Sequence, residues 1–273
     1  MKTLYVTDLD GTLLNRQDTI SEFSITTINR LVEEGMIFTY ATARSMVSAS
    51  VVTKGLTTKI PVIAYNGTFV FDASTGGILY SCAFSKEGKI YMEDLLASYH
   101  ISPLVYSYIE NEQKVSFDMK ALNDGKMRYL GLRKGDKRLR PLEGEDTLYD
   151  GDVFYYTCIG EKEDLQPLYE RIKENPYYTC IFQQELYRPE YWLEIMPKNA
   201  TKANAILQVK KMFQCDRIIS FGDAVNDIPM FQISDECYAV ENAVSQLKEY
   251  ATGIIESNDS DGVAKWLFTH FKN

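Results

Sequence analysis

The segment Asp8-Leu9-Asp10-Gly11-Thr12-Leu13 directly follows a short apolar run, residues 4–7, that predicts a buried β-strand. Two carboxylates at positions i and i+2 that leave a strand point in a similar direction, and Gly11 permits a sharp turn after them. Paired carboxylates bind Mg²⁺ through oxygen, and one of them can attack an electrophile while the other moves a proton. Taken alone, the segment is equally typical of an ordinary turn at the end of a strand.

Two further apolar runs, residues 37–41 and 61–65, resemble the first and predict neighbouring strands. The three runs end where polar residues begin, at Asp8, Thr42 and Asn66. Helical periodicity between the first two runs completes a βαβ rhythm, which is typical of a parallel sheet. Ligands of such sheets lie beyond the carboxyl ends of the strands, so these three positions are the first candidates for a site.

The middle of the chain differs in character and predicts an inserted domain. Residues 69–71 and 78–80 predict a hairpin that leaves the parallel sheet, and residues 84–196 then mix aromatic strands with amphipathic helices. The strands expected in this part are 105–108, 114–117, 153–159, 178–182 and 192–195, and the helices are 86–99, 119–130 and 163–173. This mixture indicates an α+β domain.

The βαβ rhythm returns near the end of the chain, with helices expected at residues 202–213 and 261–271 and a strand at 217–221. The predicted fold is therefore α/β, with a Rossmann-like parallel sheet split between residues 1–83 and 197–273. The inserted domain comprises residues 84–196.

Composition excludes several classes of function. The chain has 273 residues, and its 29 Lys and Arg against 38 Asp and Glu give a net charge of −9, which argues against nucleic-acid or anionic-membrane binding. No apolar run is long enough to span a membrane, and the first residues do not form a signal peptide, so we expect a cytoplasmic protein. Five scattered cysteines and two isolated histidines predict neither disulfides nor a zinc site.

A second acidic segment, Gly222-Asp223-Ala224-Val225-Asn226-Asp227, follows the strand expected at 217–221. Its carboxylates can complete a metal site with Asp8 and Asp10, although either one can instead cap a helix. Thr42 at a strand end and Lys202 at a helix start can bind a phosphate. Considered singly, both are better interpreted as a cap and a solvated lysine.

Taken together and in this order, the four segments resemble the signature motifs of the haloacid dehalogenase superfamily. The insert between Thr42 and Lys202 and the Asn66-Gly67 pair are similar to the Cof-type phosphatases of subfamily IIB, in which such an insert is a C2B cap. Ala43 and Ala203 stand where glycine is usual in that family. The resemblance covers both halves of the predicted core, whereas the insert resembles a cap by size, position and mixture of elements.

The resemblance implies a role for each matching residue. Asp8 would attack phosphorus and form an aspartyl-phosphate, and Asp10 would act as general acid and base. The implied ligands of Mg²⁺ are Asp8, Asp10, Asp223 and Asp227, the phosphate-binding residues are Thr42, Ala43, Lys202 and Asn226, and the substrate-binding candidates are Asn66, Gly67 and Arg44.

The function expected from this resemblance is Mg²⁺-dependent hydrolysis of small phosphorylated metabolites, such as sugar phosphates or pyridoxal phosphate, by a monomer or small homo-oligomer. A phosphomutase or phosphotransferase, or a catalytically silent ligand-binding protein, are the alternatives. In the insert, packing is the more frequent role for aromatic strand residues, and a solvated loop is expected for the basic run at 133–140. The candidates for substrate contact there are Tyr155, Tyr156, Tyr187, Tyr191 and Trp192.

Overall fold

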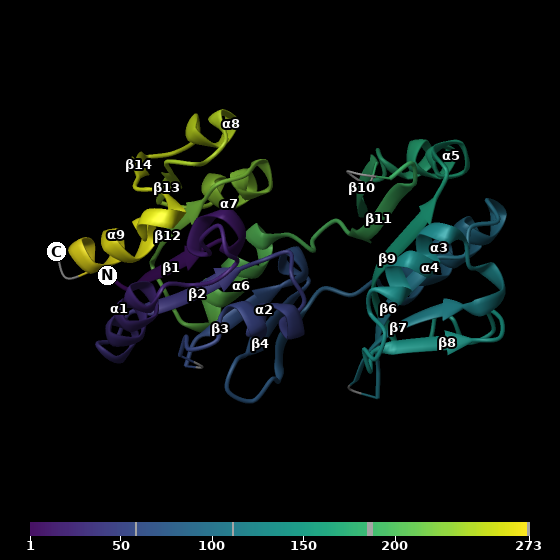
Figure 1. Ribbon diagram of the computed structural model, residues 1–273, viewed down its shortest axis with the longest axis horizontal. Coiled ribbons are helices and arrows are strands. Elements are labelled where there is room, and N and C mark those ends of the chain that lie inside the picture. The colour runs from purple at the N-terminus through teal and green to yellow at the C-terminus, as the bar shows by residue number, and fades with distance from the viewer. Residues whose placement is uncertain (58, 111, 185–187, 272–273) are drawn as a thin grey trace. The chain divides into compact units, whose positions relative to one another are not determined.

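The computed structural model describes residues 1–57, 59–110, 112–184 and 188–271, and it divides into two compact units. Unit 1 combines Met1–Ser81 with Ala200–Asn273, and unit 2 is Cys82–Asn199 (Figure 1). The chain therefore passes between the units twice, and unit 1 is assembled from both ends of the sequence. Tyr187, one of the aromatic candidates, lies outside the described residues.

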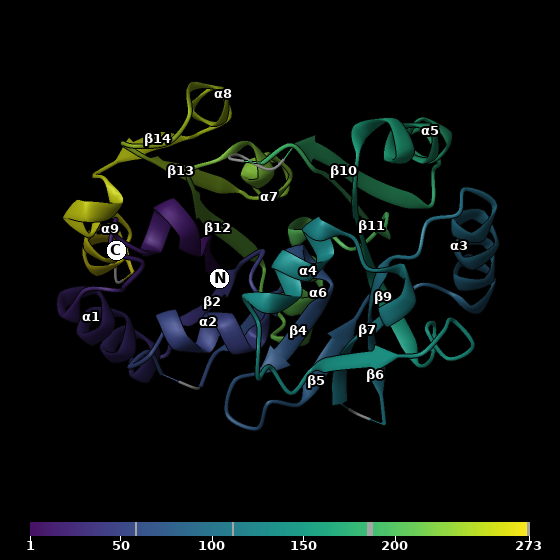
Figure 2. The same ribbon diagram turned by 45° about the vertical axis from the view of Figure 1, so that its right-hand side comes forward.

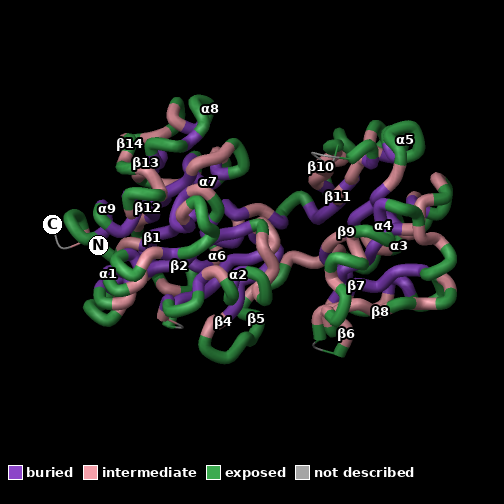
Figure 3. The backbone as a smooth tube through the Cα atoms, in the orientation of Figure 1, coloured by how far each residue is buried: buried purple, intermediate pink, exposed green. Residues whose placement is uncertain are grey.

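Unit 1 is built on an eight-stranded sheet in the order β14-β13-β12-β1-β2-β3-β4-β5. Its strands are β1 Thr3–Thr7, β2 Ile37–Ala41, β3 Pro61–Ala64, β4 Phe69–Asp72, β5 Ile78–Ser81, β12 Arg217–Gly222, β13 Glu236–Val240 and β14 Gly253–Ile255. The strands from β14 to β3 run parallel, and among them the apolar runs of β1, β2, β3 and β12 are buried on both faces, as expected in such a sheet (Figure 3). The predicted α/β fold with a parallel sheet is confirmed.

The hairpin of β4 and β5 does not leave this sheet, so that prediction is wrong. β4 pairs antiparallel with β3, with Val62 opposite Phe71, and β5 pairs with β4 at the edge. Phe69 and Phe71 are buried, and burial of these rings against the sheet holds the hairpin in it. The local sequence pattern is the same for a hairpin inside or outside a sheet, and only the partner of β4 decides between them.

Helices cover both faces of the sheet in unit 1 (Figures 1 and 2). They are α1 Glu22–Glu33, α2 Met46–Val52, α6 Lys202–Met212, α7 Ile228–Gln232, α8 Ser245–Lys248 and α9 Gly262–His270. Tyr5 of β1 lies 6.5 Å from Trp266 of α9 between ring centroids, which places α9 and its neighbour α1 on one face. On the other face the Ser234 hydroxyl, just after α7, bonds to Ser220 of β12 at 2.8 Å.

Unit 2 is built on a six-stranded sheet in the order β10-β11-β9-β6-β7-β8, in which only the β7–β8 pair is parallel. Its strands are β6 Leu104–Ile109, β7 Glu112–Asp118, β8 Leu139–Leu142, β9 Asp152–Gly160, β10 Tyr178–Gln184 and β11 Tyr191–Pro197. Its helices are α3 Lys86–Ser98, α4 Asp124–Gly131 and α5 Lys162–Ile172.

The core of unit 2 lies between one face of this sheet and the helices α3 and α5. Met92 and Leu96 of α3 and Leu168 of α5 pack with Tyr156 and Leu193 of the strands in one buried cluster. Side chains alternate along a strand, so the residue next to Leu193, Trp192, points to the opposite face. There it meets Tyr129 of α4, at 5.3 Å between ring centroids. The sheet thus has helices on both faces, with α4 on the second.

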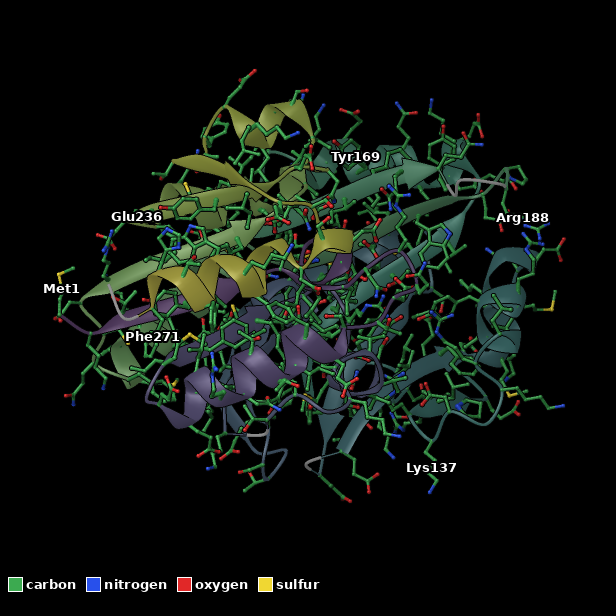
Figure 4. All side chains as sticks on the ribbon, turned by 60° about the vertical axis from the view of Figure 1, so that its left-hand side comes forward. Met1, Lys137, Tyr169, Arg188, Glu236 and Phe271 are labelled. Atoms are coloured by element: carbon green, nitrogen blue, oxygen red, sulfur yellow. The ribbon has the colours of Figure 1, made fainter. Side chains whose placement is uncertain are left out.

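Two predictions within unit 2 need correction. The helix expected at 119–130 is a single turn, Met119–Ala121, followed by an extended Leu122 and then α4, because the Asn123 side chain accepts the Lys126 N–H and begins a new helix. The basic run at 133–140 is not simply a solvated loop. Arg138 pairs with Asp136 at 2.6 Å, and the last two residues of the run, 139 and 140, belong to β8. Lys137 is exposed, and its label lies at the periphery of Figure 4.

Among the residues that the structure describes, no helix has the length and apolar character needed to cross a membrane.

Candidate active site

The candidate residues of unit 1 lie where neighbouring parallel strands end. Asp8 follows β1, Thr42 follows β2 and Asp223 follows β12, and these strands are adjacent in the sheet. Main-chain hydrogen bonds continue the pairing past the strand ends, since the Asp8 N–H donates to the Phe221 carbonyl at 2.9 Å. The edge formed by the carboxyl ends of the strands therefore brings together residues that are 215 positions apart in sequence (223 − 8).

Three carboxylates gather at this edge. Each of Asp8, Asp223 and Asp227 contributes one carboxylate oxygen, and these three oxygens lie within 4.8 Å of one another. Asp8 and Asp227 are buried, with 5% and 0% of their surface exposed, and Asp223 is half-buried. Oxygen donors of this kind and number suit Mg²⁺, which usually keeps several water molecules in its coordination sphere. The donor set therefore fits the metal expected from the sequence.

Lys202 is the buried cation of this cluster. It is the first residue of α6, which Thr201 caps by accepting the Asn204 N–H. Its Nζ lies 2.5 Å from Asp8 Oδ1 and 2.8 Å from Asp227 Oδ1. Burial by itself lowers the pKa of an ammonium, but the carboxylates of Asp8 and Asp227 raise the pKa of Lys202 above its ordinary value. Lys202 is therefore held charged beside the carboxylate that is expected to be the nucleophile.

Two carboxyl groups of the cluster bind protons more tightly than isolated aspartates do. Burial, opposed by the Lys202 charge and assisted by Asp227, raises the pKa of Asp8 to about 7. Burial and the Asp227 charge raise the pKa of Asp223 to about 6. Both shifts follow from crowding carboxylates in a poorly hydrated place, and a divalent cation there would favour the ionised forms.

Close backbone approach at Gly11 builds the cluster. Gly11 has φ +77°, and a Cβ added to it would lie 2.3 Å from Asp223 Oδ2. The predicted sharp turn after Asp10 is therefore present, and the missing side chain leaves the space that the Asp223 carboxylate fills. The Thr12 hydroxyl, one residue on, donates to Asp223 Oδ1 at 3.1 Å and orients that carboxylate.

Asp227 is held by the main chain of its own loop. Its Oδ2 accepts the N–H groups of Asp223 at 3.1 Å and Ala224 at 3.2 Å, while its Oδ1 accepts from Lys202. Helix capping was the competing interpretation for the carboxylates of this segment, and Asp227 does accept main-chain N–H groups of its own turn. The same side chain nevertheless bonds Lys202, so the local role and the membership of the cluster are compatible.

Asp10 and Arg44 are brought together with each other, outside the three-carboxylate group. The Arg44 Nε lies 3.0 Å from both oxygens of Asp10, and its Nη2 lies 2.5 Å from Oδ1. Asp18 is a second partner of the guanidinium at 3.6 Å. The Asp10 side chain is 46% exposed, so of the two acids in the opening motif Asp8 is buried and Asp10 faces solvent. Arg44, predicted as a substrate-binding residue, is thus also the partner of Asp10.

The remaining predicted residues divide into buried and exposed ones. Thr42 is fully buried, and its Oγ1 accepts the Arg44 N–H at 3.1 Å. Its carbonyl accepts the Asn66 N–H at 2.9 Å, which ties the loops after β2 and β3 together. Ala43 and Asn226 are exposed, in the loop after β2 and in the turn after Ala224.

Gly67 has a packing role. It has φ +97°, and a Cβ added to it would lie 2.1 Å from the Thr201 carbonyl oxygen and 2.7 Å from the Lys202 nitrogen. The preceding Asn66 also has a positive φ, 52°. This left-handed turn lets the chain after β3 press against the start of α6, and it thereby helps to place Lys202.

Thr12 and Asn242 support the cluster but were not singled out from the sequence. Asn242 Nδ2 donates to the Gly11 carbonyl at 2.7 Å from a loop 231 positions away. Nothing in the local sequence around Asn242 indicates this contact. Thr12 belongs to the opening motif, and a hydroxyl placed directly after the turn is the signal that could have found it.

This chain is similar in sequence to known hydrolases. The sequence model described as haloacid dehalogenase-like hydrolase matches residues 5–267. Two Bacillus subtilis proteins named 5-amino-6-(5-phospho-D-ribitylamino)uracil phosphatase, YwtE and YitU, are each 27% identical to this chain. The alignment with YwtE covers 95% of both proteins, and that with YitU covers 98% of this chain and 97% of YitU.

The fold has relatives among solved structures. A crystal structure of a Thermotoga maritima protein superimposes with a TM-score of 0.76 at 26% identity, over 98% of this chain and 97% of the other. Both units are therefore included in the match.

Proposed function

The chain belongs to the haloacid dehalogenase-like hydrolases and is a phosphatase of the Cof type, and from this premise we propose that it hydrolyses small phosphate esters with Asp8 as nucleophile and Mg²⁺ as cofactor. The observation that carries the proposal is the position of Lys202, whose Nζ bonds both Asp8 and Asp227 inside a group of three carboxylates. An acidic cluster that served only for metal storage has no need of a buried ammonium against one of its ligands.

The proposed reaction assigns a task to each residue. Asp8 attacks phosphorus and forms an aspartyl-phosphate, and Asp10 gives its proton to the departing alcohol. Asp10 then takes a proton from the water that hydrolyses the aspartyl-phosphate, which releases inorganic phosphate and regenerates Asp8. Lys202, Thr42, Ala43 and Asn226 bind the phosphoryl oxygens, and neutralising their charge is the main source of rate enhancement in phosphoryl transfer.

The Mg²⁺ would be held by the carboxylates of Asp8 and Asp223 and the main-chain carbonyl of Asp10, with Asp227 as a supporting or outer ligand, and when bound it supplies positive charge to the phosphoryl group. In the ion pair with Arg44, both carboxylate oxygens of Asp10 accept hydrogen bonds from the guanidinium and are not available to a departing alcohol. Asp10 therefore has to part from Arg44, or share it with the substrate, before the first step. Arg44 would then be free to bind the phosphate ester beside Asn66 and Gly67, as a substrate-binding residue.

We further propose that residues 1–83 and 197–273 form the catalytic core and that the insert, residues 84–196, selects the substrate. Sugar phosphates and cofactor phosphates such as pyridoxal phosphate are the proposed substrates, and the names of the Bacillus subtilis relatives add a phosphorylated ribitylamino compound to the candidates. A cytoplasmic location agrees with substrates of this kind.

Hydrolysis of p-nitrophenyl phosphate and of a panel of these compounds, with Mg²⁺ or with a chelator, tests the proposal. We expect turnover that needs the metal and that is lost in Asp8→Asn. Asp18→Asn is the matched control, because it removes the same charge from an exposed residue beside Arg44. Wild-type activity no higher than that of Asp8→Asn contradicts the proposal. A rearranged sugar phosphate in place of free phosphate identifies a mutase, and tight binding without turnover identifies a silent binding protein.

A further inference from the structure

A second buried lysine, Lys126, lies in unit 2 and differs from Lys202 in its partners. It belongs to α4, and only 7% of its surface is exposed. Its Nζ donates to two main-chain carbonyls, of Ser102 at 2.5 Å and of Ala121 at 2.8 Å. Among the described residues no carboxylate oxygen lies within 4.0 Å of this ammonium. Lys126 is therefore a buried charge with neutral partners only, which is a costly arrangement.

The side chain lines a cavity of about 720 Å³. The cavity lies between the start of α4, the end of β9 and the first turn of α5, and its polar lining includes His100, Ser102, Asn123 and Asp164. Among the described residues that line it, Lys126 is the only lysine or arginine, and Asp164, which is exposed, is the only carboxylate. A volume of this size is in the range of small-molecule sites.

Ser102 provides a second, independent observation. Its Oγ is buried and has no hydrogen-bond partner among the described residues. The carbonyl of the same residue accepts from Lys126, so the hydroxyl and the ammonium are close neighbours. An ammonium has three N–H groups, of which two are used here, and a serine hydroxyl is one further donor. The third N–H of Lys126 and the Ser102 hydroxyl are therefore two donors for which the described residues offer no acceptor.

The neighbouring carboxylates of Asp118 and Glu145 favour the charged form of Lys126, but among the described residues neither forms an ion pair with it. Cys158 of β9 is fully buried, and burial raises the pKa of its thiol to about 12, so it is neutral. The Asp118 carboxylate accepts the Lys120 N–H at the turn before α4. Burial lowers the pKa of Lys126 and outweighs the opposing effect of these two carboxylates, as expected for an ammonium without a counter-ion in direct contact.

We propose that the cavity at Lys126 and Ser102 binds a small oxyanion, either a phosphate or a carboxylate, at a site separate from the carboxylate cluster of unit 1. The ammonium supplies the charge and the serine hydroxyl a hydrogen bond, both of which a bound oxygen satisfies at once. Apolar neighbours such as Ile101, Leu122 and Leu165 complete the lining and favour an anion that carries an apolar group. Asp164 opposes anions of high charge.

Amide NMR titrations of the full chain without Mg²⁺ test this site, with inorganic phosphate and butyrate as the probes. We expect saturable shifts at the amides of Ser102, Ala121 and Asn123 with one probe or both, and the tighter one identifies the source of the anion. Lys126→Met should weaken this binding by about 10- to 100-fold, as loss of a charge-assisted hydrogen bond does. Ser102→Ala should weaken it less, and Asp164→Asn should tighten it.

Lys120→Met is the matched control, because it removes the same charge from an exposed residue of the preceding turn and should leave the dissociation constant unchanged. Shifts confined to residues 8–13 and 202, or equal affinities in wild type and Lys126→Met, overturn the proposal. If Lys126→Met does not fold, unchanged binding in both Ser102→Ala and Asp164→Asn overturns it equally. Because the readout lies in unit 2, its failure leaves the proposed hydrolysis untouched.

Discussion

The two units satisfy their buried polar groups to different degrees. In unit 1 the buried charges form one connected cluster, in which Lys202 bonds Asp8 and Asp227. In unit 2 Lys126 has carbonyl partners only. Among the described residues, the buried side-chain atoms without a hydrogen-bond partner all lie in unit 2: Ser102 Oγ, Ser107 Oγ, Tyr156 OH, Glu190 Oε2 and Trp192 Nε1.

The two units therefore differ in the cost of their buried polar groups and in the rigidity of their sites. An unpartnered buried polar atom costs about 1–3 kcal/mol of folding free energy. The described part of unit 2 contains such atoms, and that of unit 1 does not. A site whose groups are already paired is rigid and suits one reaction, since its charges need no rearrangement. The unpaired donors and acceptors of unit 2 remain available to hydrogen-bond a ligand, and ligands of different chemistry can use them. We therefore expect substitutions in the cluster of unit 1 to affect every substrate alike.

Lys202→Met should have the largest effect. Removing the ammonium takes away charge stabilisation of the phosphoryl oxygens, and turnover should fall about 10³-fold for every substrate. In the absence of metal, Asp8 and Asp227 stay buried without a counter-charge, which costs about 3–5 kcal/mol of stability. Added Mg²⁺ should restore part of that loss. Enzyme assays and thermal unfolding with and without Mg²⁺ measure both effects.

Lys211→Met controls for the loss of a lysine, because Lys211 is exposed in the same helix, α6. Its activity and unfolding midpoint should match those of the wild type. A Lys202→Met variant that loses activity on some substrates and keeps it on others contradicts the uniform effect expected of unit 1.

Gly67→Ala should destabilise the protein by about 3 kcal/mol or more. A left-handed φ costs a residue other than glycine about 1–2 kcal/mol, and the new Cβ also meets the Thr201 carbonyl at 2.1 Å. Gly76→Ala separates the two causes, since Gly76 has φ +72° with no heavy atom within 4 Å of the added Cβ. Urea denaturation should show a clearly larger loss for Gly67→Ala. Equal losses would mean that the approach of this loop to α6 does not support Lys202.

The sequence predicts the cluster because its members follow strands or begin a helix. Asp8, Thr42 and Asp223 each stand where an apolar run ends, and Lys202 stands at the start of a helical pattern. The topology of a parallel sheet then brings these positions together. Side-chain partners across long separations leave no such pattern. The pairing of Arg44 with Asp10 and the bond from Asn242 to Gly11 depend on how loops from different strands meet.

The strands missed in the sequence are the ones with weak local signals. β14 has only three residues, and β13 offers a short apolar run of four residues, 237–240, after Glu236. β8 contains Pro141, which removes a main-chain donor and argues against a strand. It pairs with β7 at the edge of its sheet, where a missing donor is tolerated. In these three cases tertiary pairing overrides local propensity.

Affinity for Mg²⁺ should fall about tenfold as the pH is lowered from 7.5 to 6, an effect confined to unit 1. The sign follows from the raised pKa values of Asp8, about 7, and Asp223, about 6, because protons held by these carboxyl groups compete with the metal. Above pH 8 both groups are ionised, and the affinity should become constant. Isothermal titration with Mg²⁺ across this range measures the effect. An affinity that is constant from pH 6 to 8 would show that these carboxyl groups do not bind the metal.

A pair of buried serines offers the smallest and most direct comparison of the two units. In unit 1 Ser220 shares a 2.8 Å hydrogen bond with Ser234, whereas in unit 2 the Ser107 hydroxyl has no partner among the described residues. Ser220→Ala should therefore cost about 1 kcal/mol of unfolding free energy, while Ser107→Ala should cost nothing or stabilise the protein, because it removes an unsatisfied group. Both serines are fully buried, so the two substitutions match in size and in burial. If urea denaturation gives equal losses, the Ser107 hydroxyl is satisfied in solution, and the contrast between the units does not extend to this residue.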